Sequence, residues 1–234
     1  MVVLAAAACG SSKKNSSTTT TTASSSSSSS SSEPTTSSSK PSVVTDTFPT
    51  TTTTPKGART AETNAKAFFA AWQANDATKM HSLGTSAAVS AALGARASGT
   101  SGYVFSNCQG AAGSTYCTWV KRGSRILVQA TNQTPYTVVG FQRQQLSAQQ
   151  TANEFFTGYQ DNNAAVVGAL ANAATATKTA GLEAHRSLAW IPPQNCDGAA
   201  GSIYCTWTAG SSKFVVRVVE VNPPPQVGDV TYTP

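Results

Sequence analysis

Two segments of the chain carry apolar residues at the spacing of an amphipathic helix. In each segment, four apolar side chains recur at positions i, i+3, i+4 and i+7, which places them on one helical face. The first set is Ala65, Phe68, Phe69 and Trp72, and the second set, 87 residues later, is Ala152, Phe155, Phe156 and Tyr159. Each segment predicts a helix with one buried face, and Thr151 with Glu154 predicts a capping box at the start of the second helix.

Each predicted helix is followed by a polar break and two shorter helical segments. The breaks, at residues 74–76 and 161–163, are rich in Asn and Asp, which favour turns and helix caps. The next short segments carry the apolar pairs Met80 with Leu83 and Val167 with Leu170. The third segments end near Gly94 and Gly181, as C-terminal glycines suggest. We therefore expect three closely packed, alanine-rich helices at the start of each half of the chain.

After the helices, the pattern changes to runs of β-branched and aromatic residues separated by Gly and polar turns, which predict strands. The expected strands are residues 103–106, 115–120, 125–131 and 136–142, followed by 188–191, 203–208, 213–221 and 227–232. Alternation along a strand places Cys117 and Trp119 on one sheet face, and Tyr116 and Thr118 on the other. Helices followed by an antiparallel sheet indicate the α+β class, with helices packed on one sheet face.

A cysteine-containing segment occurs twice in these strand regions. Cys108-Gln-Gly-Ala-Ala-Gly-Ser-Thr-Tyr-Cys117-Thr-Trp119 returns 88 residues later as Cys196-Asp-Gly-Ala-Ala-Gly-Ser-Ile-Tyr-Cys205-Thr-Trp207. A repeat of this length is a small domain rather than a solenoid unit. We therefore expect two copies of one module, at residues 59–145 and 146–234.

The matched cysteine pairs favour one disulfide in each module, Cys108 with Cys117 and Cys196 with Cys205. The alternative is a metal site, but eight intervening residues do not match the short knuckles of zinc sites, and no His lies beside either pair. Disulfides would imply an oxidising compartment. We expect neither a metal site nor a cofactor.

The N-terminus carries a candidate targeting signal. Residues 1–12 resemble the end of a bacterial lipoprotein signal peptide, in which small residues precede a cysteine that is lipidated, here Cys9. The alternative is an N-terminal fragment with an incidental cysteine. The resemblance implies a signal-peptide remnant at residues 1–9 and an anchor on the outer face of the bacterial cell membrane. Residues 10–58, mostly Ser and Thr, predict a disordered tether.

Two short segments of the repeated part resemble segments found in known groups of proteins. Ala65-Lys-Ala-Phe-Phe-Ala-Ala-Trp-Gln-Ala-Asn-Asp-Ala77 resembles the first helix of NTF2-like domains, which are cystatin-like α+β cones. The cysteine phrase is similar to one in uncharacterised secreted and lipid-anchored proteins of actinobacteria. The resemblance implies two tandem NTF2-like modules over residues 60–232, a fold that holds a pocket in some members and a filled core in others.

The charge distribution and the motifs that the sequence lacks argue against several classes of function. The chain has a net charge of +6, but its Lys and Arg residues are scattered, whereas nucleic-acid binding needs a concentrated basic stripe. No segment approaches the 18 consecutive apolar residues of a membrane-spanning helix. The sequence also lacks G-x-S-x-G, H-E-x-x-H, P-loop and G-x-G-x-x-G motifs.

Candidate site residues are few. Neither His81 nor His185 has a counterpart in the other module, and we expect both at the surface or at a helix end. Asp76 is the nearest candidate for a catalytic base of an NTF2-like enzyme, but its place between two helices favours a cap. Four large aromatic residues either line a pocket or fill the core, namely Trp72, Trp119, Tyr159 and Trp207.

Together these features favour a non-enzymatic envelope lipoprotein whose tandem modules bind a partner. The expected partners are the membrane, through the lipid anchor, and a cell-wall component or envelope protein, with no role for nucleic acid. The alternatives are a small-ligand binder that uses the cone cavity and an NTF2-like isomerase or hydrolase.

Overall fold

The described residues form two successive α+β modules. The computed structural model describes residues 60–193, 195–220 and 224–234 of the 234-residue chain. The predicted lipidation site Cys9 and the predicted tether at residues 10–58 lie outside the described residues. Each module consists of helices followed by a four-stranded antiparallel sheet, which confirms the α+β prediction and the repeat.

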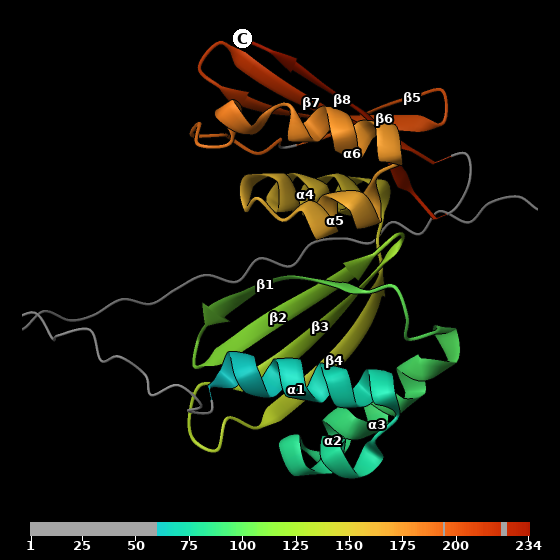
Figure 1. The fold of residues 1–234 in the computed structure, drawn as a ribbon, viewed down its shortest axis with the longest axis vertical. Helices are drawn as coiled ribbons and strands as arrows, with labels where there is room; N and C mark the ends of the chain where they lie inside the picture. The colour runs from blue at the N-terminus through green and yellow to red at the C-terminus, as the bar shows by residue number, and fades with distance from the viewer. Residues whose placement is uncertain (1–59, 194, 221–223) are drawn as a thin grey trace, which may run out of the picture. The chain divides into compact units, whose positions relative to one another are not determined.

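In module 1, three helices precede the sheet and α1 lies along one sheet face (Figure 1). The helices are α1 (Ala61–Ala74), α2 (Ala77–Leu83) and α3 (Ser86–Ala95), followed by the 3-10 turn η1 (Arg96–Ser98). The strands are β1 (Val104–Ala111), β2 (Ser114–Lys121), β3 (Ser124–Thr131) and β4 (Val138–Gln145), and they pair in that order.

Module 2 repeats this arrangement. Its helices are α4 (Ala148–Gln160), α5 (Ala164–Leu170) and α6 (Ala173–Ala180), followed by the 3-10 turn η2 (Glu183–His185). Its strands are β5 (Asp197–Ala199), β6 (Ser202–Ala209), β7 (Ser212–Val219) and β8 (Gln226–Thr233), again paired in chain order. In both modules the apolar stripes of the helices are buried against the sheet, which gives each module its core.

The apolar stripes of α1 and α4 fill the interior of each module, as their spacing predicts. The ring of Phe69 stacks on Trp119 with ring centroids 4.2 Å apart, and Phe156 stacks on Trp207 at the same distance. The polar atoms of the largest residues are satisfied, because Trp72 Nε1 donates to the Ala92 carbonyl at 2.7 Å. Tyr159 Oη likewise donates to the Leu182 carbonyl at 2.7 Å, and burial raises the pKa of this phenol.

One helix cap differs from the prediction. The capping box of α4 is formed by Ser147 and Gln150, one turn before the predicted pair Thr151 and Glu154. Thr151 is already inside the helix, where its hydroxyl donates to the Ser147 carbonyl at 2.9 Å. The Glu154 carboxylate is therefore not needed at the helix start and is available for another contact.

One predicted strand is absent. Residues 188–191 do not form a strand, and of these only Ile191 makes a backbone bridge, with Thr208. Pro192 and Pro193 follow at once, and proline cannot donate the backbone hydrogen bond that a continued strand requires. The first strand of module 2 is therefore the short β5, whereas its counterpart β1 spans eight residues.

The repeated cysteine phrase forms a disulfide-linked hairpin in each module, as predicted. Cys108 pairs with Cys117 across β1 and β2, and Cys196 is bonded to Cys205. The first hairpin turns at Ala112 and Gly113, both with positive φ, and the second turns at Ala200 and Gly201 in the same way. Two successive residues with positive φ match the twist that a two-residue hairpin turn requires.

We expect loss of the first disulfide to destabilise the protein. Replacing Cys108 and Cys117 together by Ser should lower the free energy of unfolding by ~2–3 kcal/mol, because the bond closes a loop of about ten residues in the unfolded chain. Urea denaturation of the full chain measures this loss, and a thiol reductant should destabilise the unsubstituted protein in the same direction. Unchanged unfolding after reduction would contradict a structural role for these bonds.

The two glycines of α4 and α5 differ in their surroundings, and they should respond to alanine in opposite directions. A Cβ atom at Gly158 would lie 2.5 Å from Val166 Cγ1, so Gly158→Ala should push α5 away from α4 and destabilise the fold. A Cβ atom at Gly168 meets nothing within 4 Å, so Gly168→Ala should stabilise α5 by up to ~1 kcal/mol. Melting temperatures of the two variants test this; equal shifts would disprove the close helix approach.

Candidate functional site

The four predicted aromatic residues lie in the cores of the two modules. Trp72 and Tyr159 are fully buried, and Trp119 and Trp207 are 5% and 3% exposed. Trp72 and Trp119 belong to the core of module 1, and the other two belong to the core of module 2. Of the four, Trp207 also borders a surface cleft that is described below.

The candidate titratable residues are not brought together. Asp76 is exposed and caps α2, where its carboxylate accepts the Lys79 amide at 2.8 Å. His81 is exposed on the same helix, whereas His185 belongs to module 2 and stacks on Tyr232. Within residues 60–193, 195–220 and 224–234, no group of three or more His, Cys, Asp or Glu side chains is placed to hold a metal ion.

An ion pair joins the two modules. Arg125 in β3 of module 1 donates to the Glu154 carboxylate in α4 of module 2 at 2.8 Å, and its Nε donates to Gln144 Oε1 at 2.6 Å. The side chains are 26% and 14% exposed, so the pair is largely shielded from water. Glu154, which the sequence placed in a helix cap, therefore connects α4 to the sheet of the preceding module.

A second polar contact joins α5 to β1. Asn163 caps α5 by accepting the Val166 amide at 3.2 Å, and its Nδ2 donates to the carbonyls of Phe105 and Ser106 at 3.0 and 3.2 Å. Those carbonyls lie at a bulge, because the pairing of β1 with β2 shifts register between Phe105 and Asn107. The bulge leaves backbone acceptors for which the side-chain amide is a suitable donor.

An apolar contact completes the junction. Val120 belongs to β2 of module 1, yet it is fully buried in the core cluster of module 2. The short helix α5 contacts both β1 and β2, while α4 packs on β6, β7 and β8. The helices of module 2 thus cover their own sheet and also contact the sheet of module 1.

Two clefts lie beside α4, the first between the two modules and the second lined by residues of module 2 alone. The first, of about 220 Å³, is bordered by β1, β2, β3 and α4, with Tyr116, Thr118 and the Arg125–Glu154 pair among its lining residues. The second, also of about 220 Å³, is bordered by α4 and by Trp190, Pro192, Pro193 and Trp207. Both clefts are lined by Asn153 and Thr157 of α4. We call the two clefts together the inter-module groove.

Most polar side chains of the first cleft have no partner within the described part of the chain. Apart from Arg125 and Glu154, none of its polar lining side chains makes a hydrogen bond to another described residue. These side chains are Asn107, Gln109, Tyr116, Thr118, Asn153 and Thr157. They present amide and hydroxyl groups that can both donate and accept hydrogen bonds to a ligand.

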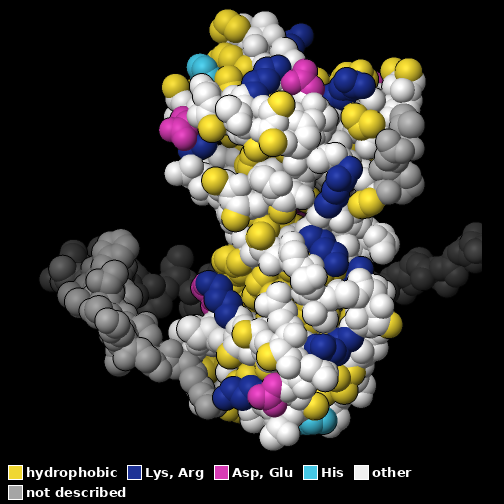
Figure 2. Space-filling model, turned by 45° about the vertical axis from the view of Figure 1, so that its right-hand side comes forward, with side chains coloured by type: hydrophobic (Ala, Val, Ile, Leu, Met, Phe, Trp, Pro, Cys, Tyr) yellow, Lys and Arg dark blue, Asp and Glu magenta, His cyan; other side chains and the backbone are white. Residues whose placement is uncertain are grey.

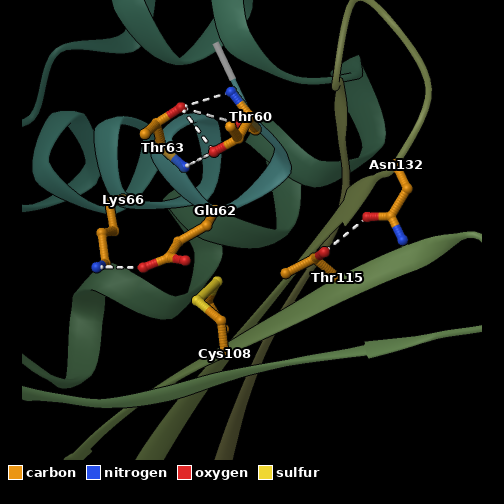
Figure 3. The surroundings of a disulfide bond; sticks show 8 residues. Thr60, Glu62, Thr63, Lys66, Cys108, Thr115 and Asn132 are labelled. Carbon is orange, nitrogen blue, oxygen red and sulfur yellow. Dashed lines mark hydrogen bonds and ion pairs between the residues drawn. A yellow bond between two sulfur atoms is a disulfide. The ribbon is translucent and has the colours of Figure 1, made fainter. Parts of the chain in front are cut away.

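A separate cleft of about 420 Å³ lies beside the first disulfide (Figure 3). Its polar groups are largely paired with one another, since Thr115 Oγ1 donates to Asn132 Oδ1 at 2.6 Å and Lys66 contacts Glu62 at 2.5 Å. Thr60 and Thr63 close the capping box of α1 at the same place. This cleft therefore offers fewer free groups than the inter-module groove.

Two features of the sequence pointed to parts of the groove. Alternation along β2 placed Tyr116 and Thr118 on the face opposite Cys117, and this face borders the groove. Glu154 was a second signal, because the position 87 residues earlier is Ala67, so the charge serves module 2 alone. Trp190, Pro192 and Pro193 were missed because residues 188–191 were expected to form a strand.

The surface shows no strong concentration of charge on the face in Figure 2, where Lys and Arg side chains are scattered over the protein. No helix in the described part of the chain is long and apolar enough to cross a membrane. Neither a family model, nor a curated protein, nor a solved structure matches the chain.

The junction should contribute measurably to stability. Val120→Ala removes two buried methyl groups and should lower the free energy of unfolding by ~2 kcal/mol, including the cavity that remains. The matched control is Thr208→Ala at the equivalent position of module 2, which should stay within ~0.5 kcal/mol of the unsubstituted protein. Urea denaturation followed by tryptophan fluorescence compares the two; equal effects would mean that the junction adds no stability.

Proposed function

We propose that the protein is a non-enzymatic binding unit of the cell envelope, and that its ligand occupies the inter-module groove. The observation that carries this proposal is the set of six amide and hydroxyl side chains that have no partner among the described residues, in a cleft built by both modules. These groups stand on strands and a helix rather than on loops, and regular elements hold the backbone positions of a site more precisely than loops do.

The cellular location indicated by the disulfides supports a role in the cell envelope. The disulfides Cys108–Cys117 and Cys196–Cys205 indicate an oxidising, extracytoplasmic environment. In this proposal, a lipid on Cys9 holds the chain at the outer face of the membrane, and the Ser/Thr-rich tether carries two NTF2-like modules away from it. The order of helices and antiparallel strands in each module is compatible with such cones.

Binding fits the groove better than catalysis. Among the described residues that line it, Glu154 is the one carboxylate, and it is held by Arg125. A general acid or base needs a free titratable group within reach of the substrate. Asp76, the sequence candidate for that role, is an exposed helix cap.

The groove also fits a ligand better than the interior of either module. Large aromatic side chains occupy both interiors, with Trp72 and Phe68 fully buried in module 1 and Tyr159 and Phe155 fully buried in module 2. A ligand inside a cone would have to displace these side chains at a cost of several kcal/mol for each large residue.

The repeat supplies a matched test of this proposal. Tyr116 lines the groove, whereas its counterpart Tyr204 lies on the sheet of module 2 and is 36% exposed. The purified full chain with Cys9→Ser, which removes the proposed lipid anchor, should sediment with isolated cell-envelope material, and adding Tyr116→Ala should weaken that binding about tenfold, the loss typical of a central aromatic contact. Tyr204→Ala should bind like the unsubstituted chain. Equal binding by both variants would refute the groove as the binding site.

A further inference from the structure

The groove is electrically neutral overall. Its two charged residues, Arg125 and Glu154, neutralise each other at 2.8 Å. The remaining polar groups of both clefts are uncharged amides and hydroxyls, including Gln160 at the end of α4. A charged ligand would find no free countercharge here, so desolvating it would cost free energy that no ion pair recovers.

The second cleft adds an aromatic wall. Trp190 and Trp207 both approach Phe156 of α4, with ring centroids 6.0 and 4.2 Å away. The Trp190 ring is fixed in place because its Nε1 donates to the His185 carbonyl at 3.0 Å. Pro192 and Pro193 line the same cleft and add further rigid apolar surface. Trp207 and Phe156 are each only 3% exposed, so the half-buried Trp190 and the two prolines supply the apolar surface of this wall, next to the amides of α4.

We propose that the inter-module groove binds a neutral glycan chain; this rests on the proposed function and names its ligand class. A sugar ring has hydroxyl groups around its edge and C–H groups on its faces. The hydroxyls both donate and accept, which matches the side chains of Asn107, Asn153 and Tyr116. The C–H faces match the aromatic wall, which can bury apolar surface without a specific polar partner.

The groove is less suited to an extended peptide. A peptide that adds a strand needs free backbone groups at a sheet edge. At the edge strand β1, the carbonyls of Phe105 and Ser106 are already taken by Asn163. A proline-rich peptide would use the aromatic wall, but its backbone offers carbonyl acceptors and few donors, so half of the hydrogen-bonding capacity of the amides would be lost.

Tryptophan fluorescence of the full chain tests the ligand class directly, because Trp190 and Trp207 line the groove. The probes are neutral oligosaccharides of glucose, mannose, galactose, arabinose and N-acetylglucosamine, together with one proline-rich peptide and one uronic-acid oligosaccharide. At least one neutral oligosaccharide should give a saturable change. Its affinity should be nearly independent of salt between ~0.05 and ~0.5 M, because the complex involves no net charge.

Two pairs of variants locate the binding. Tyr116→Ala and Asn153→Ala should each weaken binding of that oligosaccharide about tenfold. Their counterparts in the other module, Tyr204→Ala and Lys66→Ala, should leave it unchanged. Circular dichroism of each variant establishes that a loss of binding does not arise from a loss of fold.

The outcomes separate this inference from the proposed function. If no neutral oligosaccharide binds, but envelope binding still depends on Tyr116, the proposal of a glycan ligand is wrong and the proposal that the groove is the binding site is supported. Groove-dependent binding of the proline-rich peptide or of the acidic oligosaccharide alone would overturn the inference in the same way. If envelope binding does not depend on Tyr116, the proposed function itself fails.

Discussion

The structure depends on the burial of one helix pair against two sheets. α4 packs on β6, β7 and β8, and α5 contacts β1 and β2, so the helices of module 2 serve both modules. The core of module 2 accordingly includes Val120, a residue of module 1. Because small domains bury a modest fraction of their surface, a shared apolar junction adds stability that neither module has alone. The described residues of both modules accordingly fall into one compact unit.

The shared use of α4 also explains why the groove lies where it does. The ion pair of Arg125 with Glu154 and the contacts of Asn163 with β1 hold the helices and the sheet at two polar points. Beside these points, α4 and the sheet of module 1 are separated by a cleft lined by polar side chains. The two modules therefore differ at this contact. Asp76 of module 1 occupies the position equivalent to Asn163, and its carboxylate cannot donate a hydrogen bond to backbone carbonyls.

Much of each module could be predicted from local pattern, because local pattern determines local structure. The apolar stripes around Phe68 and Phe155 predicted the long helices α1 and α4, and the repeated cysteine segments predicted the disulfide-linked hairpins. The prediction at residues 188–191 failed because the following prolines cannot continue a strand. The groove was not predictable, since contacts such as Arg125 with Glu154 join residues of different modules, and a repeat period does not say which faces of two modules meet.

The central claim is that a sheet of module 1 and a helix of module 2 bind one ligand together. Hydrogen–deuterium exchange of the full chain, with and without solubilised envelope material, tests it most directly. The account predicts that added material slows exchange in β2 and α4 together, and leaves strand β7, which lines neither cleft, unchanged. Slower exchange in the sheet of module 2 alone, or no change in either module, would contradict it.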